Sequence, residues 1–199
     1  KWHRFRNITI NSSSLEWHDV ESYVTNEKIG SFSITSKNKY KRYEPEKYEL
    51  AVMMDCSQCP IHEDRKDLFN FYVDKHSKTL RANGVEPSLL MTWAYKDVPE
   101  MIDGLSSAYI SAGNRNKVMV FPAGLAFKLA QDEIPEIDLY TPDKRHPSKA
   151  GTYLMAAVIY SSIYNVSPIG NSYEYGLGQE TQSRLQKIAW AALNSYLDR

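Results

Sequence analysis

Three short, almost uninterrupted apolar runs constrain this chain more than any other feature. They span residues 48–54, 88–93 and 117–121, and each is followed by a segment with helical character. Runs of this length are typical of strands buried on both faces of a parallel sheet. Strands that alternate with helices indicate βαβ crossovers. We therefore expect an α/β fold with a mainly parallel sheet covered on both faces.

Helical patterns fill the intervals between these runs. The first helix is expected over residues 63–82, with an apolar face of Leu68, Phe71, Tyr72 and Leu80 and an end at Asn83-Gly84. Others are expected over residues 98–112, closed by Gly113, and over 124–131. Weaker patterns predict short strands at 5–10 and 31–35 and a short helix within 15–27.

The last third of the chain predicts two further helices. One begins after Ser148, which is a suitable N-cap. The other covers residues 179–197, and its apolar positions form one stripe that predicts core packing. The stripe consists of Leu185, Ile188, Ala189, Ala192, Leu193 and Tyr196.

Composition limits the class of protein. A chain of 199 residues with 42% hydrophobic and 24% charged residues suits one globular domain. Lys and Arg total 24, as do Asp and Glu, so no overall charge attracts nucleic acid. No apolar run is long enough to span a membrane. The chain begins at Lys1 rather than Met, and we expect that a segment precedes it.

In a parallel α/β sheet, ligands bind beyond the carboxyl ends of the strands. This rule predicts that residues 55–59, residues 94–97 and Pro122-Ala123 lie at one crevice. Phosphate-binding glycine loops are missing from the sequence, because neither G-x-x-x-x-G-K-[ST] nor G-x-G-x-x-G occurs.

Asp143 and His146 form the strongest candidate for acid–base chemistry. They are three residues apart in a loop that leads into a helix, so the carboxylate can fold back onto the imidazole. Such a contact fixes the tautomer and leaves the other ring nitrogen free as a base. Pro147 favours an extended backbone at His146.

Cys56 and Cys59 form a rival site. The C-x-x-C spacing between a buried strand and a helix is typical of thioredoxin-like redox centres. Two free thiols or a structural bridge are the alternatives. A metal site is not expected, because the chain has only two cysteines and no histidine pair at ligand spacing. Of the other histidines, His76 is expected to be solvated on a charged helix, and His18 to lie at the surface or behind the crevice.

The final third also carries a characteristic block of residues. The block comprises Ile137-Asp138-Leu139-Tyr140, Asp143, His146-Pro147-Ser148, Gly151, Tyr153-Leu154, Tyr160 and Ser167-Pro168. It resembles the C-terminal block of the SGNH (GDSL-like) hydrolases, most closely a bacterial branch that reads SLEWH early and HPSxxGxYL late. Weaker similarities extend this match over nearly the whole chain. They lie at Ser14-Leu15-Glu16-Trp17-His18, residues 50–60, Leu90-Met91-Thr92-Trp93 and residues 118–127.

The resemblance implies a flavodoxin-like three-layer α/β/α fold that hydrolyses an acyl ester, such as an O-acetyl group on a carbohydrate or lipid. Asp143 and His146 match the family's acid and base positions. The resemblance implies neither an organic cofactor nor a metal. It gives a slight preference for a secreted or periplasmic location.

The resemblance leaves the nucleophile open. The family's first strand and its Gly-Asp/Asn-Ser block have no match, so residues 1–199 are expected to form a single domain that lacks them. The nucleophile is then expected upstream of Lys1 or on a separate N-terminal segment or chain. Ser12 or Ser13, after a strand at residues 8–10, is the less favoured alternative.

The oxyanion donors are also altered. The second block usually offers a glycine N–H where this chain has Asn11-Ser12-Ser13, and Ser57 or Gln58 stands near the family's Asn. Such donors commonly contribute about 3 kcal/mol each to the transition state.

Three hypotheses follow. The first is a serine esterase acting on a small-molecule or glycan ester. The second is a catalytically impaired relative that binds a glycan or polypeptide through Trp17, Trp93 and Tyr95. The third is a thiol redox protein that uses Cys56 and Cys59.

Overall fold

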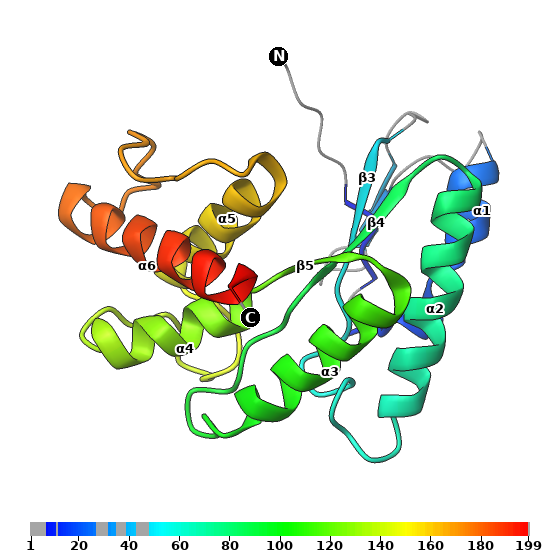
Figure 1. Cartoon of the computed structure of the whole chain (residues 1–199), viewed down its shortest axis with the longest axis horizontal. Coiled ribbons are helices and arrows are strands. Elements are labelled where there is room, and N and C mark those ends of the chain that lie inside the picture. The colour runs from blue at the N-terminus through cyan, green and yellow to red at the C-terminus, as the bar shows by residue number, and fades with distance from the viewer. Residues whose placement is uncertain (1–6, 11, 27–31, 35–38, 43–47, 199) are drawn as a thin grey trace. The chain divides into compact units, whose positions relative to one another are not determined.

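Three strands form the parallel sheet that the apolar runs predict. They are β3 (Leu50–Met53), β4 (Glu86–Leu90) and β5 (Met119–Phe121), hydrogen-bonded in that order. Helix α2 (Lys66–Ala82) connects β3 to β4, and α3 (Met101–Asn116) connects β4 to β5 (Figure 1). The expected α/β class with a mainly parallel sheet is confirmed.

The computed structural model describes residues 7–10, 12–26, 32–34, 39–42 and 48–198. The remaining helices are the 3-10 turn η1 (Leu15–Trp17), α1 (Val20–Thr25), α4 (Ala123–Glu133), α5 (Lys149–Tyr164) and α6 (Gln179–Leu197). Strands β1 (Phe32–Ile34) and β2 (Tyr40–Arg42) pair antiparallel, with Ser33 opposite Lys41. The strand expected at 5–10 lies partly outside the described residues.

The chain divides into two compact units, each described by itself below. Unit 1 comprises residues 1–88 and 112–119, and unit 2 comprises residues 89–111 and 120–199. The division therefore falls within β4, α3 and β5. In the part of the chain that the structure describes, no helix is long and apolar enough to cross a membrane.

In unit 1, helix α2 buries a face different from the one predicted. Its buried side chains are Phe69, Val73, His76, Ser77 and Leu80, whereas Leu68 and Phe71 are 37% and 59% exposed. Spacings of four, three and four residues from Phe69 to Leu80 keep these side chains on one side of the helix. The predicted face was therefore wrong: it is rotated by about one residue from the buried face, because it omitted Phe69 and Val73 and included Phe71. His76, expected to be solvated, is 1% exposed.

Strand β3 is less buried than its apolar run predicts. Met53 is 7% exposed, but its neighbours Val52 and Met54 are 43% and 49% exposed. Successive side chains of a strand point to opposite faces, so only one of the two faces of β3 is covered by the described residues of the chain.

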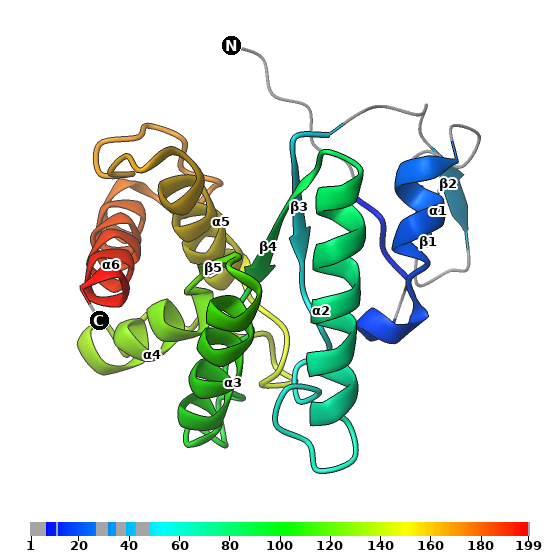
Figure 2. The same ribbon diagram turned by 45° about the vertical axis from the view of Figure 1, so that its right-hand side comes forward.

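In unit 2, helices α4, α5 and α6 pack together (Figure 2). The predicted stripe of α6 is confirmed for five of its members, since Leu185, Ile188, Ala189, Ala192 and Leu193 are all buried. The helix also has the predicted bounds. Two other helices differ: α2 begins at Lys66 rather than 63, and α3 continues past Gly113 to Asn116.

Close backbone approaches in unit 2 explain two of its glycines. A Cβ at Gly124 in α4 would lie 2.2 Å from the Thr92 carbonyl oxygen, and one at Gly151 in α5 would lie 2.3 Å from that of Leu139. Both neighbours are backbone atoms, so they have little freedom to move. Each helix can contact the backbone segment beside it only because the side chain is absent.

Gly124→Ala is therefore expected to destabilise the protein. Overpacking against backbone typically costs about 1–3 kcal/mol in the free energy of unfolding, measurable by urea denaturation. Gly104→Ala is the matched control, because Gly104 is exposed within α3 and alanine favours helix by about 0.5–1 kcal/mol. Equal stability of the two variants would contradict the close approach.

Candidate functional site

The loop between Leu139 and Ser148 carries the candidate acid–base pair of unit 2. An isolated bridge joins Tyr140 to Pro147, and the Ser148 amide donates to the Leu139 carbonyl at 2.8 Å. Ser148 then starts α5 as predicted, since its Oγ accepts from the amides of Ala150 and Gly151 at 3.1 and 3.2 Å. The loop is thus held at both ends by backbone hydrogen bonds.

The carboxylate of Asp143 organises the interior of this loop. Its Oδ1 accepts from Thr141 Oγ1 at 2.7 Å, from the Arg145 amide at 2.9 Å and from the His146 amide at 3.0 Å. Its Oδ2 lies 2.5 Å from Nδ1 of His146. The contact that the three-residue spacing suggests is therefore present, together with three bonds that fix the carboxylate.

The electrostatics of this pair favour a charged carboxylate and an oriented imidazole. The hydrogen bonds from His146, Thr141 and Arg145 hold the pKa of Asp143 well below its usual range. With the proton of His146 on Nδ1, facing the carboxylate, Nε2 is left as the basic nitrogen. The imidazole is 79% exposed, so Nε2 can be reached from solvent.

The segment that follows β4 supports the loop from outside. The indole Nε1 of Trp93 donates to the Arg145 carbonyl at 2.9 Å, and the Lys96 amide donates to the Lys144 carbonyl at 3.0 Å. The Arg145 guanidinium also pairs with Asp97. Of the three segments predicted to share a crevice, residues 94–97 therefore contact the Asp143–His146 loop.

No hydroxyl among the described residues is hydrogen-bonded to Nε2 of His146. The two serines considered as nucleophiles, Ser12 and Ser13, belong to unit 1. Their part in catalysis remains a prediction.

Ser13 has a histidine partner within its own unit. Its Oγ lies 3.1 Å from Nε2 of His18, whose Nδ1 lies 3.4 Å from the hydroxyl of Tyr23. Burial lowers the pKa of His18, which favours its neutral form. Ser12, exposed beside this pair, has a left-handed backbone with φ of 59°. No residue spacing in the sequence predicted the contact between Ser13 and His18.

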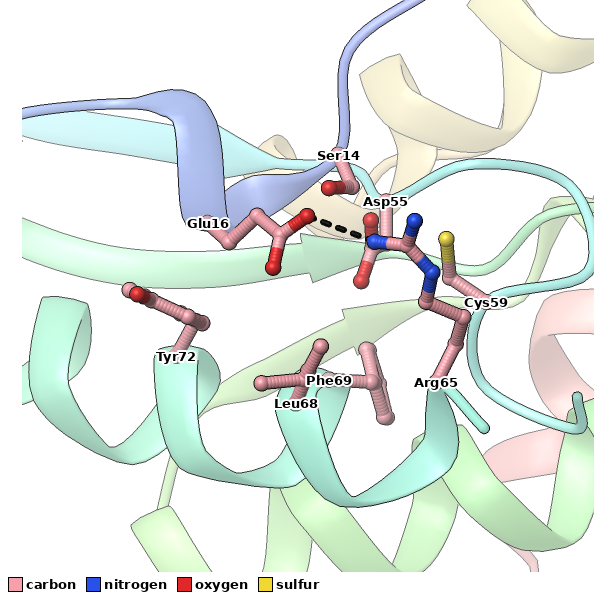
Figure 3. Close-up of a pocket in the computed structure, with 8 residues that line it drawn as sticks. All are labelled: Ser14, Glu16, Asp55, Cys59, Arg65, Leu68, Phe69 and Tyr72. Atoms are coloured by element: carbon pink, nitrogen blue, oxygen red, sulfur yellow. Dashed lines mark hydrogen bonds and ion pairs between the residues drawn. The ribbon is translucent and has the colours of Figure 1, made fainter. Parts of the chain in front are cut away.

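Unit 1 also contains a small pocket at the end of β3 (Figure 3). Asp55, one of its lining residues, is 5% exposed, and its Oδ1 accepts from the amides of Leu15 and Cys56 at 3.1 and 2.8 Å. Burial nevertheless raises the pKa of Asp55, against the effect of these two hydrogen bonds. Sequence reasoning named Asp55 only as part of the crevice and missed its burial.

Polar groups converge on this pocket from two other elements. Arg65 pairs with Glu16 at 2.5 Å, as Figure 3 shows. The Oγ of Ser14 is buried without a hydrogen-bond partner among the described residues. An unsatisfied buried hydroxyl typically costs about 1–3 kcal/mol.

Cys56 and Cys59 form a disulfide, one of the alternatives that the sequence left open. Between them, Ser57 is half-buried and Gln58 is exposed, and their predicted role as oxyanion donors remains a prediction. Within the described residues, Asp55, Cys56 and Cys59 are the one group with three potential metal ligands close together. Both sulfurs are bonded to each other, so the oxidised group offers a metal only the carboxylate.

Comparison with known proteins shows the fold. No protein-family model matches the chain, and no curated protein does. A DUF4886 family protein from Bacteroides uniformis is similar in structure, with a TM-score of 0.75 and 18% identity over 97% of this chain and 83% of that one. A protein from Slackia heliotrinireducens, provisionally described as an SGNH hydrolase, has a TM-score of 0.51 and 22% identity over 59% of this chain and 67% of its own.

The buried His76 predicts a pH dependence of stability. Its Nε2 donates to the Leu15 carbonyl at 2.9 Å, and burial lowers its pKa from 6.5. Below about pH 6.5 the unfolded chain binds a proton that the folded protein does not, so stability falls as the pH decreases. His76→Gln, which keeps an N–H donor, is expected to make this fall shallower in urea denaturation between about pH 7 and 5.

His62→Gln is the control for this experiment, since the His62 side chain is 50% exposed. It removes a histidine from the surface of the same unit. If the His76 and His62 variants both retain the wild-type slope, the buried imidazole does not govern the pH dependence.

Proposed function

We propose that the protein is a serine-type carboxylic ester hydrolase in which His146 is the general base and Asp143 orients it. The observation that carries this proposal is the 2.5 Å contact between Asp143 Oδ2 and His146 Nδ1, which leaves Nε2 exposed. The block around these residues resembles that of the SGNH hydrolases. A fold shared with one such protein supports the proposal at the level of architecture.

The proposed reaction follows from the geometry of the pair. Nε2 of His146 takes the proton of a serine hydroxyl as its oxygen attacks the acyl carbon, and returns that proton to the departing alkoxide. Water then attacks the acyl-serine by the same proton path and releases the carboxylic acid. Asp143 stays ionised throughout and stabilises the imidazolium, as its lowered pKa favours.

The substrate class is an acyl ester, with an O-acetyl group on a carbohydrate as the first choice. We treat residues 1–199 as one domain. Its nucleophilic serine is to be identified by experiment. Ser12 and Ser13 are the candidates within this chain, and a serine preceding Lys1 is the other source.

Hydrolysis of p-nitrophenyl acetate and of an acetylated sugar by the native full-length protein tests the proposal. His146→Gln should abolish turnover, and Asp143→Asn should lower kcat by about a hundredfold or more, as loss of the orienting carboxylate does in other triads. A fluorophosphonate probe followed by peptide mass spectrometry would identify the serine.

Two controls separate chemistry from loop folding. Thr141→Val removes one hydrogen bond to Asp143 and leaves the imidazole contact, so kcat should fall much less than in Asp143→Asn. His62→Gln removes an exposed histidine of the other unit. Absence of both probe labelling and ester turnover in the native protein would refute the enzymatic proposal.

That outcome would favour the glycan- or polypeptide-binding alternative, for which the structure gives mixed support. Trp93 stacks on Phe127 at 4.8 Å, and the Arg145 guanidinium covers Tyr95 at 4.0 Å. Both rings therefore have intramolecular partners. Trp17 is 59% exposed and is the one of the three aromatic residues that most readily meets a ligand.

A further inference from the structure

The two cysteines differ in their access to solvent. Cys59 is buried, at 4% exposure, whereas Cys56 is half-buried and stands at the carboxyl end of β3. Such an asymmetry suits thiol–disulfide exchange, because one sulfur can meet the partner while the other attacks from within. The disulfide between them closes a short loop in front of α2.

A backbone donor faces the sulfur of the less buried cysteine. The amide of Cys59 donates to Sγ of Cys56 at 3.0 Å. When the disulfide is reduced, an N–H group aimed at this sulfur stabilises the thiolate over the thiol. Cys56 is therefore the better nucleophile and the better leaving group of the two.

A buried carboxylate stands beside both sulfurs. An oxygen of Asp55 and the two Sγ atoms all lie within 4.8 Å of one another. Asp55 is 5% exposed and is anchored through Oδ1 to the amides of Leu15 and Cys56. An acid kept from water at this distance can take a proton from the Cys59 thiol, and burial raises its affinity for that proton.

We propose that Asp55, Cys56 and Cys59 form a thiol–disulfide exchange centre, an activity separate from ester hydrolysis. Its substrates are exposed dithiols and disulfides of peptides or proteins. Cys56 and Cys59 are the catalytic residues. Asp55 exchanges a proton with Cys59: it donates the proton when the disulfide opens and accepts it back when the disulfide forms.

The reaction is balanced by the dithiol substrate. A substrate thiolate attacks Sγ of Cys56, the Cys56–Cys59 bond breaks, and the Cys59 thiolate takes a proton from Asp55. The second thiolate of the substrate then attacks the substrate's first sulfur, which is bonded to Cys56 in the mixed disulfide. The substrate disulfide forms, and Cys56 is released as a thiolate. The protein gains two electrons and the substrate becomes a disulfide; the reverse sequence reduces a substrate disulfide.

The experiment uses the full chain and two measurements. Reduction of insulin by dithiothreitol should proceed faster with the wild-type protein than without it, and Cys56→Ser and Cys59→Ser should each return the rate to the uncatalysed value. Incubation in glutathione buffers of increasing reducing power, followed by alkylation and mass spectrometry, should show the wild-type disulfide opening within the glutathione range.

The variants distinguish a disulfide that exchanges with substrates from one that only stabilises the fold. Cys59→Ser should accumulate a mixed disulfide at Cys56, whereas Cys56→Ser should not, because Cys59 is buried. Asp55→Asn should shift the pH profile of insulin reduction, which a merely structural role would leave in place. Asp64→Asn is the control, since Asp64 is 85% exposed in the same connection.

A wild-type disulfide that stays closed in the most reducing glutathione buffer, with no acceleration of insulin reduction, would overturn the proposal. This readout needs no variant, so it holds even where a cysteine substitution prevents folding. Trapping of partner at Cys59 rather than Cys56 would equally contradict the assigned order of attack.

Discussion

Hydrogen bonding of an aspartate carboxylate to backbone amides holds the candidate site segment in each of the two compact units. In unit 2, Asp143 accepts from the amides of Arg145 and His146 and thereby shapes the loop that presents the imidazole. In unit 1, Asp55 accepts from the amides of Leu15 and Cys56 and so fastens η1 to the end of β3. Without its acceptor, the unit 1 segment would leave the buried Leu15 amide without this partner.

The two carboxylates nevertheless have opposite electrostatic character. Asp143 is accessible to solvent and gains more from its hydrogen bonds than it loses by desolvation, so its pKa falls. Asp55 accepts similar bonds, but its burial dominates and its pKa rises. The first is therefore suited to remain charged and orient a histidine, and the second to exchange a proton with a neighbouring thiol.

Local pattern predicted much of this fold and part of the candidate site. The α/β class, the span of α6 and the N-cap at Ser148 follow from periodicity and capping chemistry, which depend on residues close in sequence. The contact between Asp143 and His146 could be predicted for the same reason, since both residues belong to one loop. The catalytic role of Asp143 and His146 stays a prediction.

Burial was harder to predict, because it depends on which elements pack against a residue. His76 carries a polar ring on a charged helix, yet η1 supplies a carbonyl at Leu15 that allows it to be buried. The apolar run of β3 suggested cover on both faces, and Val52 and Met54 are exposed because the described residues cover only one. The side chains of Ser13 and His18 are in contact across a turn that the spacing of residues in the sequence does not predict.

The sequence by itself determined the order of strands and helices, the Asp143–His146 pair and the C-x-x-C spacing, because each is encoded by neighbours along the chain. The tertiary structure alone decided that Cys59 is buried while Cys56 is half-buried, and that Asp55 is buried beside both sulfurs. Desolvation is set by atoms brought from distant parts of the chain. The chemical character of these groups therefore appears only when the chain is folded.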